Sequence, residues 1–236
     1  MNLVKGNTTM LKLMAQTAIV AALASGAHAA TLDFEGYDAG TILTGFDVDS
    51  ITGTISATGG SGDAMIFDSN NFTGGDRDLA APFYAELTGT RPANGTPVAG
   101  TETLNPGNIL IISEDGDQSD PDDNGRGGTI TFSFDSLVTF TGFDVLDDVT
   151  NFVVTADTGA TTGPINLDYD NQFASFTGLD WEGVSSIVFD FGRSSGAIDS
   201  ISFDAPAAVP VPAALPLALV GFGAFGFVAR RKRQAS

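Results

Sequence analysis

Cysteine is absent from this 236-residue sequence, and histidine occurs once, at position 28. Without cysteine the chain has no disulfide framework, no iron–sulfur cluster and no thiol nucleophile. Lysine is absent between residues 33 and 204, which excludes Schiff-base chemistry there. His28 lies in a leader-like N-terminal segment, so the remaining chain also lacks a His-ligated zinc site and a Ser-His-Asp centre. Only carboxylates and oxygen-bound metal ions are left for any chemistry.

Basic residues are scarce, and the acidic ones are confined to the middle of the chain. All 29 aspartates and glutamates lie between Asp33 and Asp204, where four arginines leave a net charge of −25. This charge attracts cations and repels nucleic acid and anionic lipid, so we expect neither of the latter as a partner. The sequence is 42% hydrophobic with 18 phenylalanines, which predicts a folded core rather than a disordered acidic tail.

The first 29 residues have the layout of a secretory signal peptide. Lys5 and Lys12 precede an apolar stretch at 13–24, and small residues follow, ending in Ala27-His28-Ala29. This A-x-A pattern predicts cleavage by signal peptidase after Ala29, with Ala27 as the other small residue of the site. A transmembrane anchor is the alternative, but a spanning helix needs about 20 apolar residues and this stretch is shorter.

Residues 206–236 contain a proline-rich motif, an apolar run and a basic end. The motif is Val209, Pro210, Val211, Pro212 and Ala213, and the basic cluster is Arg230, Arg231, Lys232 and Arg233. A short apolar span followed by basic residues orients the tail toward the cytoplasm and leaves the preceding domain outside.

This order of motif, span and basic cluster resembles the PEP-CTERM class of bacterial sorting signals, in its VPLPA variant, with Val211 in place of leucine. The resemblance implies an exosortase, a membrane protease that removes the tail and releases the protein to the cell surface or the exopolysaccharide matrix. Contact with the membrane would then be transient and limited to the C-terminal segment. A permanent single-pass anchor is the alternative.

Residues 30–205 alternate apolar and polar side chains, and clusters of Gly, Asn and Asp interrupt the pattern. The alternation is regular at 32–35, 129–134 and 198–203, and helical periodicity is missing there. Further strands are expected at 48–57, 64–68, 82–88, 108–113, 137–146, 151–156, 164–168 and 185–191. About ten short strands predict an all-β domain, a jelly-roll-like β-sandwich, between the signal peptide and a hydrophobic sorting helix. A closed barrel is the competing architecture.

Acidic residues are densest at 114–125, directly after a predicted strand. Asp120, Asp122, Asn124 and Gly125 have the spacing of the first half of an EF-hand loop, although Thr131 stands where the loop needs glutamate. This pattern predicts a calcium site in a β-loop rather than an EF-hand. The predicted ligands are Glu114, Asp115, Asp117, Asp120, Asp122 and Asn124, with Asp76 and Asp78 from a second cluster at 68–79.

Two further groups of acids are candidate cation sites. One is Asp144, Asp147 and Asp148 at a predicted strand end; the other is Asp33, Glu35 and Asp199, which would meet if the first and last strands were neighbours. For every cluster the alternative is a solvated turn, because Asp and Asn favour turns and negative charge keeps secreted proteins soluble.

The segments 67–68, 73–79, 107–115, 120–123 and 127–132 are similar, in order and sequence, to secreted β-sandwich domains that commonly carry such sorting tails. This resemblance implies an extracellular surface module and no particular activity. We therefore expect a non-enzymatic exported protein with calcium in its acidic loops.

Two other functional classes remain open. In a carbohydrate-binding module, with polysaccharide as the partner, Trp181, Tyr169 or Tyr84 would stack on sugar rings beside carboxylates. A glycoside hydrolase would use a pair of carboxylates, and 29 acids offer too many pairs for the sequence to favour one.

Overall fold

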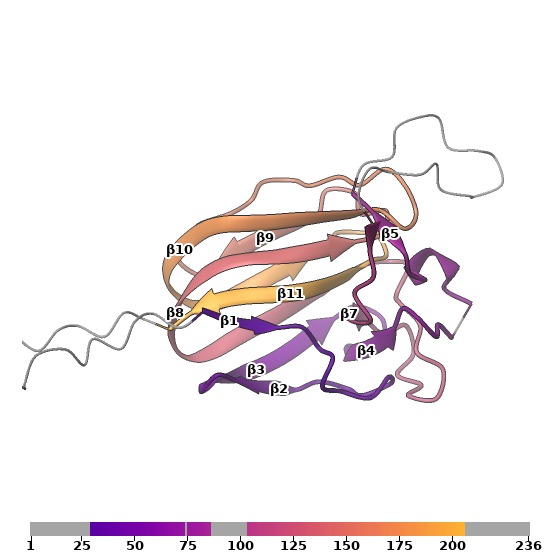
Figure 1. Ribbon diagram of the computed structural model, residues 1–236, viewed down its shortest axis with the longest axis horizontal. Helices are drawn as coiled ribbons and strands as arrows, with labels where there is room; N and C mark the ends of the chain where they lie inside the picture. The colour runs from indigo at the N-terminus through magenta and orange to yellow at the C-terminus, as the bar shows by residue number, and fades with distance from the viewer. Residues whose placement is uncertain (1–28, 74, 86–102, 206–236) are drawn as a thin grey trace, which may run out of the picture. The chain divides into compact units, whose positions relative to one another are not determined.

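The alternating segments form short antiparallel strands. The computed structural model describes residues 29–73, 75–85 and 103–205, all within one compact unit that spans Ala27–Pro206 (Figure 1). The strands are β1 (Ala29–Leu32), β2 (Gly45–Val48), β3 (Ile51–Thr58), β4 (Ala64–Asp68), β5 (Phe83–Tyr84), β6 (Thr103–Leu104), β7 (Asn108–Ile112), β8 (Thr129–Leu146), β9 (Val153–Ala156), β10 (Phe173–Asp190) and β11 (Ala197–Asp204). One 3₁₀ turn, η1 (Arg77–Leu79), is the only helical element in these ranges. Within them, no helix has the length and hydropathy needed to cross a membrane.

Most of the two predicted terminal signals lies outside the described residues. This applies to Ala27 of the cleavage site, to the proline-rich motif at 209–213 and to the basic cluster at 230–233. Ala29, the predicted last residue of the leader, is described and opens β1, where it pairs with Asp204 of β11. The predicted boundaries after 29 and after 205 therefore stay predictions.

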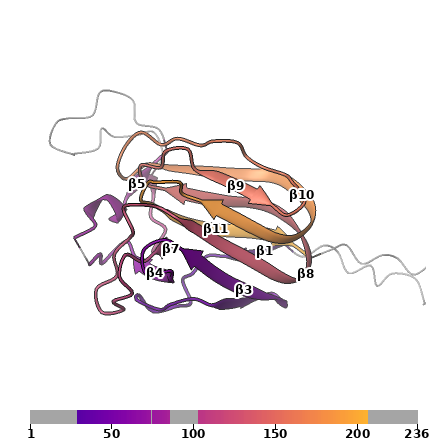
Figure 2. The ribbon, with the colours of Figure 1, turned by 180° about the vertical axis from the view of Figure 1, so that it is seen from behind.

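Nine strands form one sheet, organised by the long strands β8 and β10. The main path is β2-β3-β8-β11-β7-β4, with β1 beside β11 and β9 beside β10. The first half of β8 lies between β3 and the end of β10, and its second half lies between β11 and the start of β10. The β8–β10 register shifts between Thr177 and Ser186, and the sheet curls over itself there (Figures 1 and 2).

The predicted all-β class is confirmed for the described residues, and a curled sheet of this kind is compatible with a sandwich. The segments predicted as separate strands at 129–134 and 137–146 form one continuous strand, β8. The two residues left between the predicted strands, Asp135 and Ser136, are exposed but lie inside β8.

Three predicted strands differ from the structure for local reasons. The alternating segment 32–35 overlaps β1 only at Leu32, because the strand ends there and Phe34 has a φ of 60°. The segment 48–57 is divided by a tight turn at Asp49 and Ser50, both with positive φ (49° and 69°), which joins β2 to β3. Two such residues suit a two-residue hairpin turn, but Asp-Ser lacks the glycine that usually marks one in a sequence. In 164–168 the only pairing is an isolated bridge between Ile165 and Phe152.

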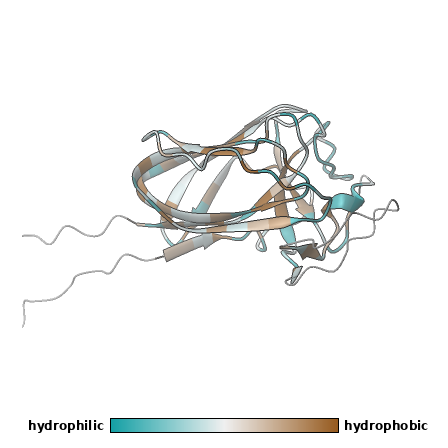
Figure 3. Ribbon diagram, turned by 90° about the horizontal axis from the view of Figure 1, so that it is seen from above, coloured by the Kyte–Doolittle hydropathy of each residue, from teal (hydrophilic) through white to brown (hydrophobic). Residues whose placement is uncertain are grey.

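The interior of the curled sheet is a phenylalanine-rich core. Along β8, Ile130, Phe132 and Phe134 are buried and their neighbours are more exposed, as the alternation predicts. Figure 3 shows hydrophobic and hydrophilic residues alternating along the strands. Phe46 of β2 and Phe203 of β11 have ring centroids 5.9 Å apart although their strands are not neighbours. The curl therefore brings distant strands into one core, and each buried ring contributes about 1.5–3 kcal/mol.

A second, smaller core covers the other face of β4, β7 and the end of β8. It contains Met65, Phe67, Leu79, Phe83, Ile109, Ile111, Leu146, Phe173 and Ala197. The segment 69–85 supplies Leu79 and Phe83, so it packs onto strands whose two faces are both buried. This packing carries the acidic residues at 68–79 to the ends of β7 and β8.

Candidate metal centre

Two of the acidic segments, 68–79 and 114–125, are in direct contact. The backbone N–H of Asp123 donates to Oδ2 of Asp76 at 2.8 Å. The hydroxyl of Thr73 donates to the carbonyl oxygen of Pro121 at 3.0 Å. Both hydrogen bonds hold one carboxylate-rich loop against the other, and the charges of Glu114 and Asp122 contribute to raising the pKa of Asp76.

Asn171 connects the third acidic segment, at 144–148, to the same place. Its side-chain amide donates to the carbonyl oxygens of Asp78 and Ala80, each at 2.7 Å. Its backbone N–H donates to Oδ1 of Asp147 at 3.3 Å. Asn171 is buried, and through these bonds it fixes the turn before β10 between η1 and the end of β8.

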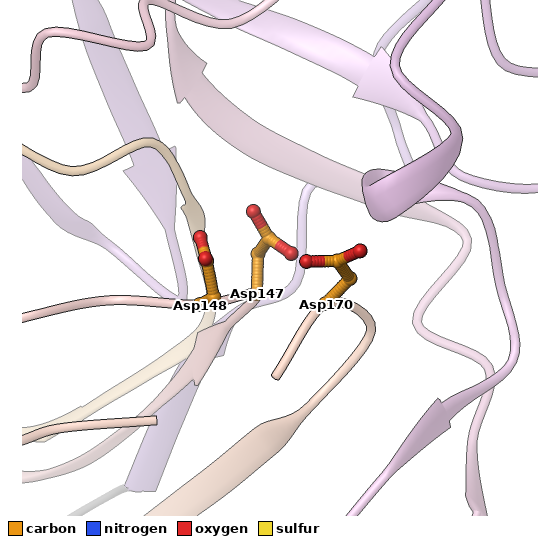
Figure 4. A group of neighbouring side chains, drawn as sticks. All are labelled: Asp147, Asp148 and Asp170. Atoms are coloured by element: carbon orange, nitrogen blue, oxygen red, sulfur yellow. The ribbon is translucent and has the colours of Figure 1, made fainter. Parts of the chain in front are cut away.

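Asp147, Asp148 and Asp170 form a compact carboxylate group at this junction. Each contributes one oxygen, and these oxygens all lie within 4.8 Å of one another. Figure 4 shows the side chains of Asp147 and Asp170 facing each other, with Asp148 alongside. Asp147 follows the last residue of β8 and has a φ of 76°, a left-handed conformation that Asp tolerates better than most residues. We call these three residues the carboxylate triad.

Asp147 is the buried member of the carboxylate triad. It is 0% exposed, and its Oδ2 accepts a hydrogen bond from the hydroxyl of Ser195 at 3.2 Å. Burial, with smaller contributions from the charges of Asp78, Asp148 and Asp123, raises the pKa of Asp147 to about 8. At neutral pH this carboxyl group must therefore hold a proton or lie beside a cation.

Asp123 and Asp76 extend the buried negative charge. Burial, together with the charges of Asp76 and Asp78, raises the pKa of Asp123 to about 7. The pKa of Asp76 rises to about 6, again mainly through burial. Oδ2 of Asp123 accepts the backbone N–H of Gly196 at 2.8 Å, a bond that favours the ionised form. These carboxyl groups and the triad thus influence one another electrostatically.

Four of the ligands predicted at 114–125 lie on the surface: Glu114, Asp115, Asp117 and Asp120 are exposed. Asp115 and Asp117 organise their own turns. Oδ1 of Asp115 accepts the backbone N–H of Asp117, and Oδ1 of Asp117 accepts both the backbone N–H and the hydroxyl of Ser119. The bonds from Ser119 lower the pKa of Asp117, so this carboxylate is stable in its ionised form without a metal.

The other two predicted ligands of this loop, Asn124 and Asp122, differ in their hydrogen bonding. Asn124 is buried, and its side chain holds a turn by donating to the carbonyl oxygen of Gly127 at 2.6 Å. Asp122 is partly buried, its Oδ1 has no hydrogen-bond partner among the described residues, and burial raises its pKa. Within the described residues, the loop 114–125 forms no group of three acidic ligands as close as the carboxylate triad.

The sequence predicts an acidic strand end at 144–148, which supplies two members of the triad, but not the third. Asp147 and Asp148 belong to the candidate cation site predicted at 144–148, but there they were grouped with Asp144. Asp170 was not considered, because it stands alone between Tyr169 and Asn171. The sequence feature that could have indicated Asp170 is the turn-like composition Asp-Tyr-Asp-Asn at 168–171, shortly before β10. The contacts of Asn171 fix this turn.

An open polar pocket of about 570 Å³ lies beside the triad. Asp148 lines it together with Gly125, Thr150, Asn151, Gly192, Arg193, Ser194 and Ser195. Ser195 also bonds Asp147, so the pocket adjoins the buried part of the triad. The lining contains hydroxyl, amide and guanidinium groups and one carboxylate, but no aromatic ring.

The aromatic residues proposed to stack on sugars do not line this pocket. Trp181 of β10 is half-buried and packs on the core, with its ring centroid 5.5 Å from that of Phe140. Tyr84 lies in β5, where its backbone N–H donates to the carbonyl oxygen of Asn171. Tyr169 is next to Asp170 in the turn before β10.

Comparison of the chain with family models, curated proteins and solved structures yields no significant match.

Proposed function

We propose that this chain is a non-enzymatic exported protein of the cell surface or polysaccharide matrix, whose jelly-roll-like β-sandwich is stabilised by calcium at the carboxylate triad. The observation that carries the proposal is the closeness of the three carboxylates, with oxygens within 4.8 Å and Asp147 fully buried. Three such groups repel one another when ionised, and a bound divalent cation removes that cost.

The ligand chemistry favours calcium over other metals. The triad offers only carboxylate oxygens, and the described residues contain neither cysteine nor histidine. Soft or borderline metals prefer sulfur and nitrogen ligands, whereas Ca²⁺ accepts oxygens in flexible geometry and takes further ligands from water. The adjoining open pocket leaves room for such waters beside Asp148.

A structural role fits Asp147 better than a catalytic one. Carboxyl groups with raised pKa values also occur in active sites, but Asp147 is 0% exposed and both its oxygens already accept hydrogen bonds. A glycoside hydrolase needs two carboxyl groups on either side of the scissile bond, and the pocket next to the triad is lined by one.

A calcium-dependent sugar site is the second candidate function, and the pocket beside Asp148 is the observation that favours it. Its hydroxyl, amide and guanidinium groups suit the hydroxyl groups of a saccharide. The absence of aromatic rings from the lining argues for weak binding. A glycan array with and without Ca²⁺ tests this candidate, and binding only in Ca²⁺ supports it.

Export and processing rest on the sequence of the two ends. Mass spectrometry of the protein recovered outside the cell should give an N-terminus at Ala30 and the loss of residues from the apolar run onward. Recovery only of a membrane-bound form with an intact basic cluster at 230–233 would indicate a permanent anchor instead.

The test of calcium binding compares the thermal stability of the full chain in EDTA, in CaCl₂ and in NaCl of equal ionic strength. Free Ca²⁺ at 100 times its dissociation constant should add about 2.7 kcal/mol, whereas NaCl only screens. Asp148→Asn combined with Asp170→Asn should remove the calcium-specific part. Asp47→Asn, an exposed site in β2, is the matched control. Equal responses to CaCl₂ and NaCl would refute the proposal.

A further inference from the structure

A second pair of carboxyl groups lies across two neighbouring strands, away from the triad. Asp199 of β11 and Asp144 of β8 are directly opposite in the antiparallel ladder. Directly opposite residues share a face of the sheet, with Cβ atoms about 4.5–5.5 Å apart. The register shifts by one residue between Asp199 and Ser202, and Ser200 in this bulge has a φ of 51°. The bulge therefore sits beside the acidic pair.

Asp199 is buried with an unsatisfied oxygen. The residue is 3% exposed, and its Oδ2 accepts a hydrogen bond of 3.3 Å from the hydroxyl of Ser200. Oδ1 of Asp199 is buried and has no hydrogen-bond partner among the described residues. A buried polar atom without a partner costs about 1–3 kcal/mol, and more if it is charged. Some group that satisfies Oδ1 would remove this cost.

Two negative charges, those of Asp144 and Asp33, act on Asp199. Burial, together with the charges of Asp144 and Asp33, raises the pKa of Asp199 to about 8. Burial also raises the pKa of Asp144, while hydrogen bonds from the hydroxyls of Ser175 and Ser200 oppose the shift. Ser200 is thus shared between the two carboxyl groups. Asp33 lies near Asp199 because β1 pairs with β11. The first and last strands are therefore neighbours, as the candidate site at Asp33, Glu35 and Asp199 assumed.

We propose that Asp199 and Asp144, with the hydroxyl of Ser200 between them, bind a second divalent cation, for which Ca²⁺ is the best fit. Two carboxylates opposite each other on a sheet are destabilising unless their charge is neutralised. A proton would neutralise only one of the two carboxyl groups, and Oδ1 of Asp199 accepts no hydrogen bond from the described residues. A divalent cation would coordinate Oδ1 and neutralise both carboxylate charges, and a site with only oxygen ligands suits Ca²⁺.

Such an ion would fasten β11 to β8 at the bulge. Because β1 pairs only with β11 in the described sheet, the ion would also stabilise the attachment of β1. The second cation site shares no residue with the triad. Asp147 and Asp148 follow β8 and Asp170 lies before β10, whereas Asp144 and Asp199 lie within strands. Failure of one site therefore leaves the other open to test.

The experiment counts Ca²⁺ bound to the full chain at saturation, by equilibrium dialysis at pH 8. Compared with the wild type, Asp199→Asn should bind one ion fewer because the second site is lost. Asp148→Asn combined with Asp170→Asn should also bind one ion fewer, because the triad site is lost. All three substitutions together should lose two. Asp144→Asn, at a less buried position, repeats the test in case Asp199→Asn folds poorly, and Asp47→Asn is the control. An unchanged count in Asp199→Asn or Asp144→Asn would overturn the proposal.

A second readout does not depend on changing Asp199. In the variant that lacks Asp148 and Asp170, calcium should still slow amide hydrogen exchange in β11 and β1. Exchange in these two strands that is the same in Ca²⁺ and in EDTA would mean that a proton, not a cation, neutralises Asp199.

Discussion

Removing calcium and raising the pH should unfold this domain through Asp147. Its pKa is raised from 3.8 to about 8 by burial and by neighbouring acids. Because the folded-state pKa lies above the unfolded one, the folded state holds the proton more tightly. The free energy of unfolding is therefore highest below the unfolded pKa of about 4 and falls as the pH rises through about 8.

The size of this effect follows from the pKa difference. Each pKa unit corresponds to about 1.4 kcal/mol, so ionised Asp147 costs the folded state about 5 kcal/mol relative to the protonated form. Domains are stable by only about 5–15 kcal/mol in total. Asp123, with a pKa of about 7, and Asp76, with a pKa of about 6, lose their protons in the same range and deepen the loss. In EDTA the domain should approach its stability limit above pH 8.

Urea unfolding in EDTA at pH 5, 7 and 9 measures this loss in the wild type and in Asp147→Asn. Asparagine keeps an acceptor for the N–H of Asn171 but cannot ionise, so the variant should exceed the wild type only slightly at pH 5 and by several kcal/mol at pH 9. Calcium should flatten the wild-type profile, because the ion replaces the proton as its ligands ionise. A flat wild-type profile in EDTA, or an Asp147→Asn variant that is less stable at pH 9, would refute this reasoning.

Other predictions concern the framework around the triad. Phe143→Ala should cost about 3–5 kcal/mol in urea unfolding, because the ring is 1% exposed and contacts several other rings. Gly196→Ala should destabilise by about 2 kcal/mol, because its φ is 134° and a Cβ would lie 2.8 Å from Val149. Gly159→Ala, where φ is also positive but the space is open, should cost less. Asn171→Ala should cost about 1–3 kcal/mol and weaken calcium binding in calorimetry, because it removes both 2.7 Å bonds that fix the turn of the triad.

The strands were largely predictable because burial on one face leaves a local signature. The alternation at 129–134 marks the start of β8, and 198–203 lies within β11. The length of β8 was not predictable, because Asp135 and Ser136 are exposed and are of residue types that favour turns. Whether such residues end a strand or let it bend depends on the partner strands, here β10 and β11, which pair with β8 from far along the chain.

The acidic segments were predictable, but the state of each carboxyl group was not. The densest cluster, at 114–125, contributes mainly exposed turn residues, and Asp123 from the same loop is only 8% exposed. Asp170 joins the triad through the contacts of Asn171 with Asp78 and Ala80, which are more than 90 residues away. Local density of acids therefore indicated where negative charge would gather, while long-range packing decided which charges are buried.

A crystal structure of the full chain grown with millimolar CaCl₂, with anomalous diffraction used to locate calcium, tests the central claim most directly. The account predicts an ion bound to oxygens of Asp147, Asp148 and Asp170 at about 2.3–2.6 Å. Crystals at pH 8 with calcium present but no ion at these three carboxylates would contradict it.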